Sequence, residues 1–146
     1  MNIIEELNSL EKELDSDFLK ENKLSFVFKM SGKKDVHFGF YNEETKKVTD
    51  FGMRNGQIVS KDEDDSKTDN ILEIDKEAIK NYDNLKKKVS KKTDSMNLMK
   101  KIYYLFNSKK PIWKVTFIDS SFNAKHINFD AYTLEAESES SDSLTR

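Results

Sequence analysis

The 146-residue chain contains no cysteine, one proline and only four glycines. Without cysteine, thiol catalysis, disulfide bonds and zinc or iron–sulfur centres held by thiolates are all excluded. The glycines, at positions 32, 39, 52 and 56, are too scattered to form a glycine-rich phosphate-binding loop. The apolar runs are at most a few residues long, far short of a membrane span. We therefore expect no membrane-spanning segment.

An excess of either charge is also missing. The chain has 25 Lys and Arg against 27 Asp and Glu, a net charge of −2. Nucleic-acid binding depends largely on neutralising phosphates, so this balance argues against a nucleic-acid partner. The first residues, Met1 to Glu6, form neither a basic leader nor an apolar run. We therefore expect no signal peptide and a cytoplasmic location.

Aromatic side chains are what the sequence has in quantity. Ten Phe, five Tyr and one Trp make up 11% of the chain. Such bulky side chains allow an apolar fraction of 36% to fill a core. A chain of this length buries roughly two thirds of the surface that its unfolded form exposes. We therefore expect it to fold without a disulfide bond or a structural metal ion.

The first 60 residues predict a helix followed by antiparallel strands. Apolar residues recur at helical spacing from Ile3 to Phe18, which predicts one helix over residues 3–20, capped by Asn2. Alternating apolar residues predict strands over 24–30 and 35–41. Asn55-Gly56 predicts a further hairpin.

The pattern starts again after an acidic break. Residues 61–70 carry no apolar side chain, which is typical of a solvated linker. Residues 75–106 show helical spacing, with a gap at 90–95 where we expect Asp94 or Ser95 to cap a second helix. Strands are predicted over 112–118 and 125–129, and a disordered tail over 138–146. The two helical stripes are Ile79, Tyr82, Leu85 and Val89, then Met96, Met99, Ile102, Tyr103 and Phe106.

The two parts of the chain can be laid over one another. Placing 26–28 on 115–117 puts Phe38 on Ile127 and Phe40 on Phe129, and 42–45 then lie on 130–133 after a one-residue slip. We predict an α+β fold in which amphipathic helices pack on one face of an antiparallel sheet. Two related helix-plus-hairpin halves, 1–60 and 71–137, would build it, with one compact domain as the alternative.

The second half resembles the PepSY-like domains over roughly residues 95–137. Trp113-Lys114-Val115-Thr116-Phe117 matches a W-x-V-x-F pattern of that family, and Asp130-Ala131-Tyr132-Thr133-Leu134-Glu135 matches D-A-x-T-G-E except at its glycine. Leucine tolerates a left-handed backbone poorly, so Leu134 argues against a tight left-handed turn there. The resemblance implies a helix on a small antiparallel sheet, and a noncatalytic module that modulates a partner or a protease.

Few residues suggest chemistry. His37 and His126 could form a metal pair or a base and its helper, but a metal site needs three or four donors, and both fit the polar face of a strand. The acidic run 62–65 could bind a hard cation, yet it lacks the spacing of a calcium loop. We therefore assign no catalytic, metal or cofactor residue and expect no cofactor.

Two surface features could bind a partner. The aromatic residues Phe38, Phe40 and Tyr41 could form an exposed platform, although alternation favours a core position for them, as for Trp113. The basic residues could contact phosphates, although a solvated helix face explains them as well. They are Lys86, Lys87, Lys88, Lys91, Lys92, Lys100 and Lys101.

These observations together favour a noncatalytic protein-interaction module, such as an inhibitor or immunity-type protein, with an unidentified protein partner. One alternative is small-molecule binding, or an unrecognised enzyme activity, in a pocket on the sheet face. Another is nucleic-acid binding through the Lys86–Lys92 helix. Two chains could also pair through a sheet edge.

Overall fold

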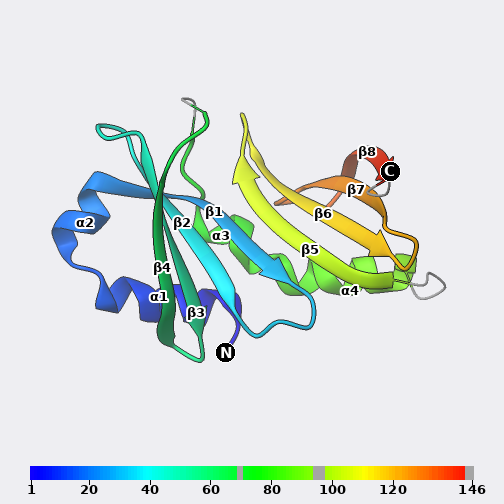
Figure 1. Ribbon diagram of the computed structural model, residues 1–146, viewed down its shortest axis with the longest axis horizontal. Coiled ribbons are helices and arrows are strands. Elements are labelled where there is room, and N and C mark those ends of the chain that lie inside the picture. The colour runs from blue at the N-terminus through cyan, green and yellow to red at the C-terminus, as the bar shows by residue number, and fades with distance from the viewer. Residues whose placement is uncertain (69–70, 94–97, 144–146) are drawn as a thin grey trace.

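The structure is a computed structural model that describes residues 1–68, 71–93 and 98–143. Its strands form one antiparallel sheet in the order β4-β3-β2-β1-β5-β6-β7-β8 (Figure 1). The strands are β1 (Asn22–Met30), β2 (Val36–Asn42), β3 (Lys47–Arg54), β4 (Gln57–Asp65), β5 (Leu98–Asn107), β6 (Pro111–Asp119), β7 (Asn123–Asp130) and β8 (Ala136–Ser143). The helices are α1 (Ile3–Glu13), α2 (Ser16–Glu21), α3 (Lys76–Lys80) and α4 (Tyr82–Thr93).

The fold is therefore α+β with an antiparallel sheet, as predicted, but the sheet is its larger part. Two four-stranded meanders meet at the centre, where β1 pairs with β5. The meander β1–β4 follows α1 and α2, and the meander β5–β8 follows α3 and α4. None of the described helices is long and apolar enough to cross a membrane.

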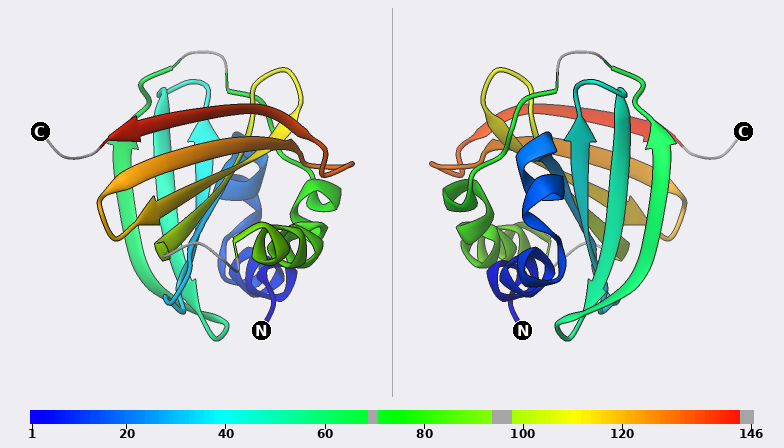
Figure 2. Two further views of the ribbon diagram at one scale, coloured as in Figure 1. Left: turned by 90° about the vertical axis from the view of Figure 1, so that its right-hand side faces the viewer. Right: turned by 90° about the vertical axis from the view of Figure 1, so that its left-hand side faces the viewer.

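The core lies between the helices and the sheet, which curves around them when viewed along the long axis (Figure 2). α1 faces the first meander, through contacts with β2, β3 and β4, and α4 runs beneath the second (Figure 1). Because strand residues alternate between faces, only every second side chain of the inner strands reaches this core, and the edge strands β4 and β8 contribute none of its buried residues. Among its least exposed side chains are Leu7, Leu10, Phe38, Leu85, Val89, Leu105, Trp113 and Phe129.

Trp113 connects the sheet to the helices. Its indole N–H donates to the carbonyl oxygen of Ala78 at 2.9 Å, which ties β6 to α3. The Trp113 ring lies 5.5 Å from the ring of Tyr82, and that ring lies 5.1 Å from Tyr103. Trp113 is fully buried, so the predicted core position is confirmed.

The predicted helix over 3–20 is wrong in one respect, because it is two helices. Asn2 caps α1 as predicted, accepting from the backbone N–H of Glu5. Leu14 then adopts an extended backbone, and the Asp15 carboxylate accepts from the N–H of Phe18 to start α2. The apolar stripe continues across this break, since Phe18 packs edge-on against Phe40 and Phe51.

The predicted helix over 96–106 is wrong, because its described residues, 98–106, belong to the strand β5. β5 lies between β1 and β6, and alternate residues such as Tyr103 and Leu105 are buried. A run of apolar side chains that fits helical spacing also fits a central strand with apolar residues on both faces, and pairing with two neighbouring strands decides between them. Asp94, Ser95 and Met96 lie outside the described residues. The earlier stripe of Ile79, Tyr82, Leu85 and Val89 is buried, as predicted, but it spans two helices, because α3 ends at Lys80 and α4 begins at Tyr82.

The predicted acidic linker and disordered tail are also partly wrong, since both contribute edge strands. Residues 61–65 belong to β4, and residues 138–143 belong to β8. Every residue of β8 is exposed, as are nearly all of β4. Charged and serine-rich sequences are typical of unstructured segments, which is why strands are not predicted here. Natural edge strands carry charge as well, because it prevents pairing with other chains. These acids therefore argue against pairing of two chains through an edge.

The turns after β2 and β7 have the same structure. Asn42 Oδ1 accepts from the N–H groups of Glu44 and Thr45, and Asp130 Oδ1 accepts from those of Tyr132 and Thr133. The fifth residue of each turn, Lys46 or Leu134, has a left-handed φ of 59° or 61°. The expectation that Leu134 prevents a left-handed turn is therefore wrong, because its partly buried side chain also packs on the core.

The predicted overlay of the halves differs by one strand from an alignment that follows the order of elements, and the relation between the halves stays a prediction. The overlay places β1 on β6 and β2 on β7, whereas the order of elements places β1 on β5 and β2 on β6. The matching turns produced this shift, because they follow the second strand of one meander and the third strand of the other.

We expect Trp113→Phe to lower the free energy of unfolding by about 2–3 kcal/mol, because a buried carbonyl loses its donor and a smaller ring leaves a void. Urea denaturation measures the change. Val59→Ala, at a side chain that is 46% exposed on β4, is the control and should change stability by less than about 0.5 kcal/mol. Equal stability of Trp113→Phe and the unaltered protein would contradict this role.

Candidate functional site

The two histidines do not meet. His37 is on β2 and His126 is on β7, with β1, β5 and β6 between these strands. Nδ1 of His37 lies 3.0 Å from an Asp50 oxygen, whereas His126 contacts Thr116 at 2.8 Å and Asp142 at 3.2 Å. Within the described part of the chain, no group of three or more His, Asp or Glu side chains could hold a metal ion. Each histidine fits a polar position on a strand.

The aromatic platform suggested by Phe38, Phe40 and Tyr41 is not exposed. Phe38 and Phe40 belong to the core beneath the helices, and Tyr41 is 1% exposed on the other face. The Tyr41 hydroxyl is buried and makes no hydrogen bond within the described residues. The interpretation of Phe38 and Phe40 as core residues is therefore confirmed.

A different aromatic row lies on the face of the sheet opposite the helices. β1 contributes Phe26 and Phe28, and β5 contributes Tyr104 and Phe106, with Phe26 opposite Phe106 and Phe28 opposite Tyr104. Their neighbours along each strand point to the core, so these four point away from it. All four are partly exposed. We call them the aromatic row.

The rings of the aromatic row contact one another across the two strands. The Phe26 and Tyr104 centroids are 5.8 Å apart, and Tyr104 and Phe106 are stacked at 5.3 Å. Phe28 packs edge-on against the His37 ring at 6.0 Å. Burial raises the pKa of Tyr104, so its hydroxyl is protonated at neutral pH. The row thus offers an apolar surface with one hydrogen-bonding group.

A groove of about 740 Å³ lies over one end of the row. Phe26, Tyr104 and Phe106 line it together with Val48 and Ile71. Asp65 to Thr68 and Asn107 supply its polar border. The Asn107 side-chain oxygen is buried and has no hydrogen-bond partner among the described residues, while its amide donates to the carbonyl of Glu73. An apolar floor with a few polar groups is the usual character of a binding site.

Gly39 allows the Phe26 ring to lie flat at the groove. A Cβ atom at position 39 would be 1.9 Å from Cε2 of Phe26, so any larger residue must displace the ring. Ser25, beside Phe26, donates from its hydroxyl to the Gly39 carbonyl at 3.0 Å. Glycine is therefore required here by the close approach of an aromatic ring.

Three aspartates on β3 and β4 lie on the same face of the sheet as the groove. Asp50 lies opposite Asp62, and Asp64 lies opposite Val48, which lines the groove. These three carboxylates share the helix-free face, because they alternate with residues of the other face along β3 and β4. Like charges placed directly opposite each other destabilise a strand pair. Asp62 and Asp64 of the predicted acidic run therefore form, together with Asp50, an acidic border on the same face as the aromatic row. Asp50 is held by His37.

The lysine-rich helix residues do not form one surface. Lys86 lies over the Tyr82 ring at 5.5 Å, whereas Lys88 lies over the Phe129 ring and donates to the Leu134 carbonyl. Lys87 and Lys91 are exposed, and the side chain of Lys92 is outside the described set. The lysines that are grouped in the sequence of this helix thus point to different parts of the structure and do not form a single basic patch.

Comparison with known proteins identifies the fold. No family model matches the chain, and no curated protein matches its sequence. Among solved structures, a putative lipoprotein from Clostridium difficile 630 superposes with a TM-score of 0.64, at 8% identity over 93% of this chain and 91% of that one. At this identity the likeness shows the shared fold alone. The resemblance to PepSY-like domains and the cytoplasmic location stay predictions.

We expect Gly39→Ala to lower the free energy of unfolding by about 1–3 kcal/mol, because the added methyl group overpacks against Phe26. The NMR signals of the Phe26 and Tyr104 rings should shift as the ring is displaced. Gly32→Ala, in a left-handed turn with no atom within 4 Å of the added Cβ, is the control for backbone strain without overpacking. Unshifted ring signals in Gly39→Ala would contradict the arrangement.

Proposed function

We propose that this chain is a noncatalytic binding module that holds an extended segment of a partner protein against the helix-free face of its sheet. The observation that carries the proposal is the aromatic row with its groove, at the centre of a face that no described helix covers. Aromatic side chains supply large contact areas at protein interfaces. The sequence favours one form of this function. In that form the chain is an inhibitor or immunity-type protein that blocks its partner by covering it.

The chemistry of the face specifies the partner segment. The aromatic row favours apolar side chains, and the acidic border of Asp50, Asp62 and Asp64 favours lysine or arginine next to them. The segment would lie across β1 and β5 rather than along an edge, because both edge strands carry acids of their own. A small molecule is the weaker candidate, because the groove opens on a surface rather than within the packed core.

We also propose that the two halves are related copies, aligned as β1–β4 on β5–β8, and that PepSY-like domains are their relatives. The same order of two helices and four strands in each half supports this. Two copies bury faces that one copy leaves open, so each half depends on the other.

Selection of random displayed peptides on the immobilised protein tests the function. Retained peptides should combine aromatic or aliphatic residues with lysine or arginine. Tyr104→Ala and the pair D62K and D64K should each weaken a retained peptide at least roughly tenfold, because they remove an aromatic anchor and reverse the border charge. Fluorescence polarisation measures the affinities.

The matched controls alter the same residue types elsewhere. Tyr132→Ala removes a tyrosine that is 46% exposed, and D17K reverses an exposed acid on α2. Both should leave peptide affinity within about twofold, since neither residue touches the row or the groove. Equal losses in the controls, or no enrichment of peptides at all, would refute the proposal.

A further inference from the structure

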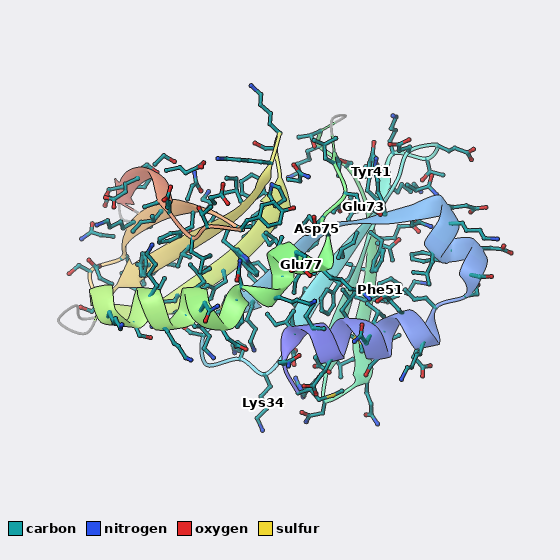
Figure 3. The ribbon with its side chains drawn as sticks, turned by 180° about the vertical axis from the view of Figure 1, so that it is seen from behind. Lys34, Tyr41, Phe51, Glu73, Asp75 and Glu77 are labelled. Carbon is teal, nitrogen blue, oxygen red and sulfur yellow. The ribbon has the colours of Figure 1, made fainter. Side chains whose placement is uncertain are left out.

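A cavity of about 300 Å³ lies on the helix side of the sheet, between α4 and the turn that joins β1 to β2. Lys29 and Lys33 line it from the strand and the turn, Lys86 from α4, and Lys101 from β5. No aspartate or glutamate is among its described lining residues. Figure 3 locates the turn by Lys34, which projects away from the molecule. We call this cavity the lysine cavity.

The four ammonium groups have no carboxylate partner within the described residues. Elsewhere lysines do pair with acids, as Lys76 does with Glu11 at 2.8 Å. Lys29 instead donates to the backbone carbonyls of Lys33 and Asp35. None of the four lysines that line the cavity thus forms a salt bridge with a described carboxylate.

The two acids that act electrostatically on Lys29, Asp35 and Glu6, are already engaged. Asp35 accepts a hydrogen bond from the Arg54 guanidinium, and Glu6 accepts one from the backbone N–H of Gly56. Burial lowers the pKa of Lys29, and the positive charge of Lys86 lowers it further, while Asp35 and Glu6 act in the opposite direction. The ammonium groups of Lys29 and Lys86 are therefore close enough to repel each other.

We propose that the lysine cavity binds a small, multiply charged anion of the phosphate class. Such an anion would offset the repulsion between Lys29 and Lys86 and accept charge-assisted hydrogen bonds from the lining lysines. The hydroxyl groups of Ser31 and Ser90 also line the cavity and can donate to phosphate oxygens. Ser31 is held in place, because its oxygen accepts from the N–H of Lys101 at 2.8 Å.

The cavity suits a small anion better than a nucleic acid. Lys87 and Lys91 do not line it, so the lining lysines surround one small cavity instead of following a strand of phosphates. The buried rings of Tyr82 and Tyr103 form its wall and already contact each other edge-on, so they offer no face for a base to stack on. This site is independent of the aromatic row, which lies on the opposite face.

Titration of pyrophosphate, followed by calorimetry and by backbone NMR shifts, tests the proposal. Saturable binding should appear below about 1 mM, with shifts at the β1–β2 turn and α4, and it should weaken at least roughly tenfold in K86Q and in K101Q. K34Q in the same turn and K87Q on the same helix are the controls, and both should bind within about twofold of the unaltered protein. K86Q should also be as stable as the unaltered protein or more so, because it relieves repulsion.

The remaining outcomes identify the ligand or overturn the site. Inorganic phosphate and a sugar phosphate, titrated in parallel, distinguish a free phosphate from a phosphorylated metabolite, and tighter binding of either supports the proposal. Absence of saturation by about 10 mM pyrophosphate would overturn it. So would equal losses in K34Q and K86Q, or tighter binding of short single-stranded DNA that depends on Lys87.

Discussion

The pairing of β1 with β5 is the interaction on which the rest of the molecule depends. Five residue pairs, from Phe26 with Phe106 to Met30 with Ile102, join two meanders into one sheet. This continuity lets helices from both halves share a core, with Trp113 bound to α3 and Phe18 packed on the first meander. It also brings four aromatic side chains together on the other face. Because the aromatic row combines residues of β1 and β5, neither half forms it alone.

The two faces of the sheet differ in charge more than the balanced composition suggests. One side of the helix-free face carries Asp50, Asp62 and Asp64, whereas the helix side holds four lysines around one cavity. Figure 3 shows a further acidic stretch, in which Glu73, Asp75 and Glu77 succeed one another from the connecting segment into α3. A net charge near zero therefore conceals opposite local fields, and each field favours a different ligand.

The sequence predicts those parts of the fold that depend on neighbours in the chain. The structure confirms three such local patterns: the cap at Asn2, the alternation of Trp113, Val115 and Phe117, and the buried stripe from Ile79 to Val89, although two helices share that stripe. The prediction for β5 was wrong because Met99, Ile102, Tyr103 and Phe106 fit helical spacing but would also supply apolar side chains to both faces of a strand, and only distant partners choose between these structures. The aromatic row could not be predicted for the same reason, because it depends on the pairing of strands that are distant in the sequence. Phe26 and Phe28 share a predicted face, but nothing local places Tyr104 beside them.

The central position of β1 has a consequence for synthesis. Its outer neighbour β2 follows within a few residues, but its other neighbour β5 begins only at Leu98. At about 5–20 residues per second, the ribosome leaves the inner edge of β1 unpaired for several seconds while the first meander is already complete. During that interval Phe26 and Phe28 lack their cross-strand partners, so the nascent chain is most open to chaperones and to mispairing before its second half emerges.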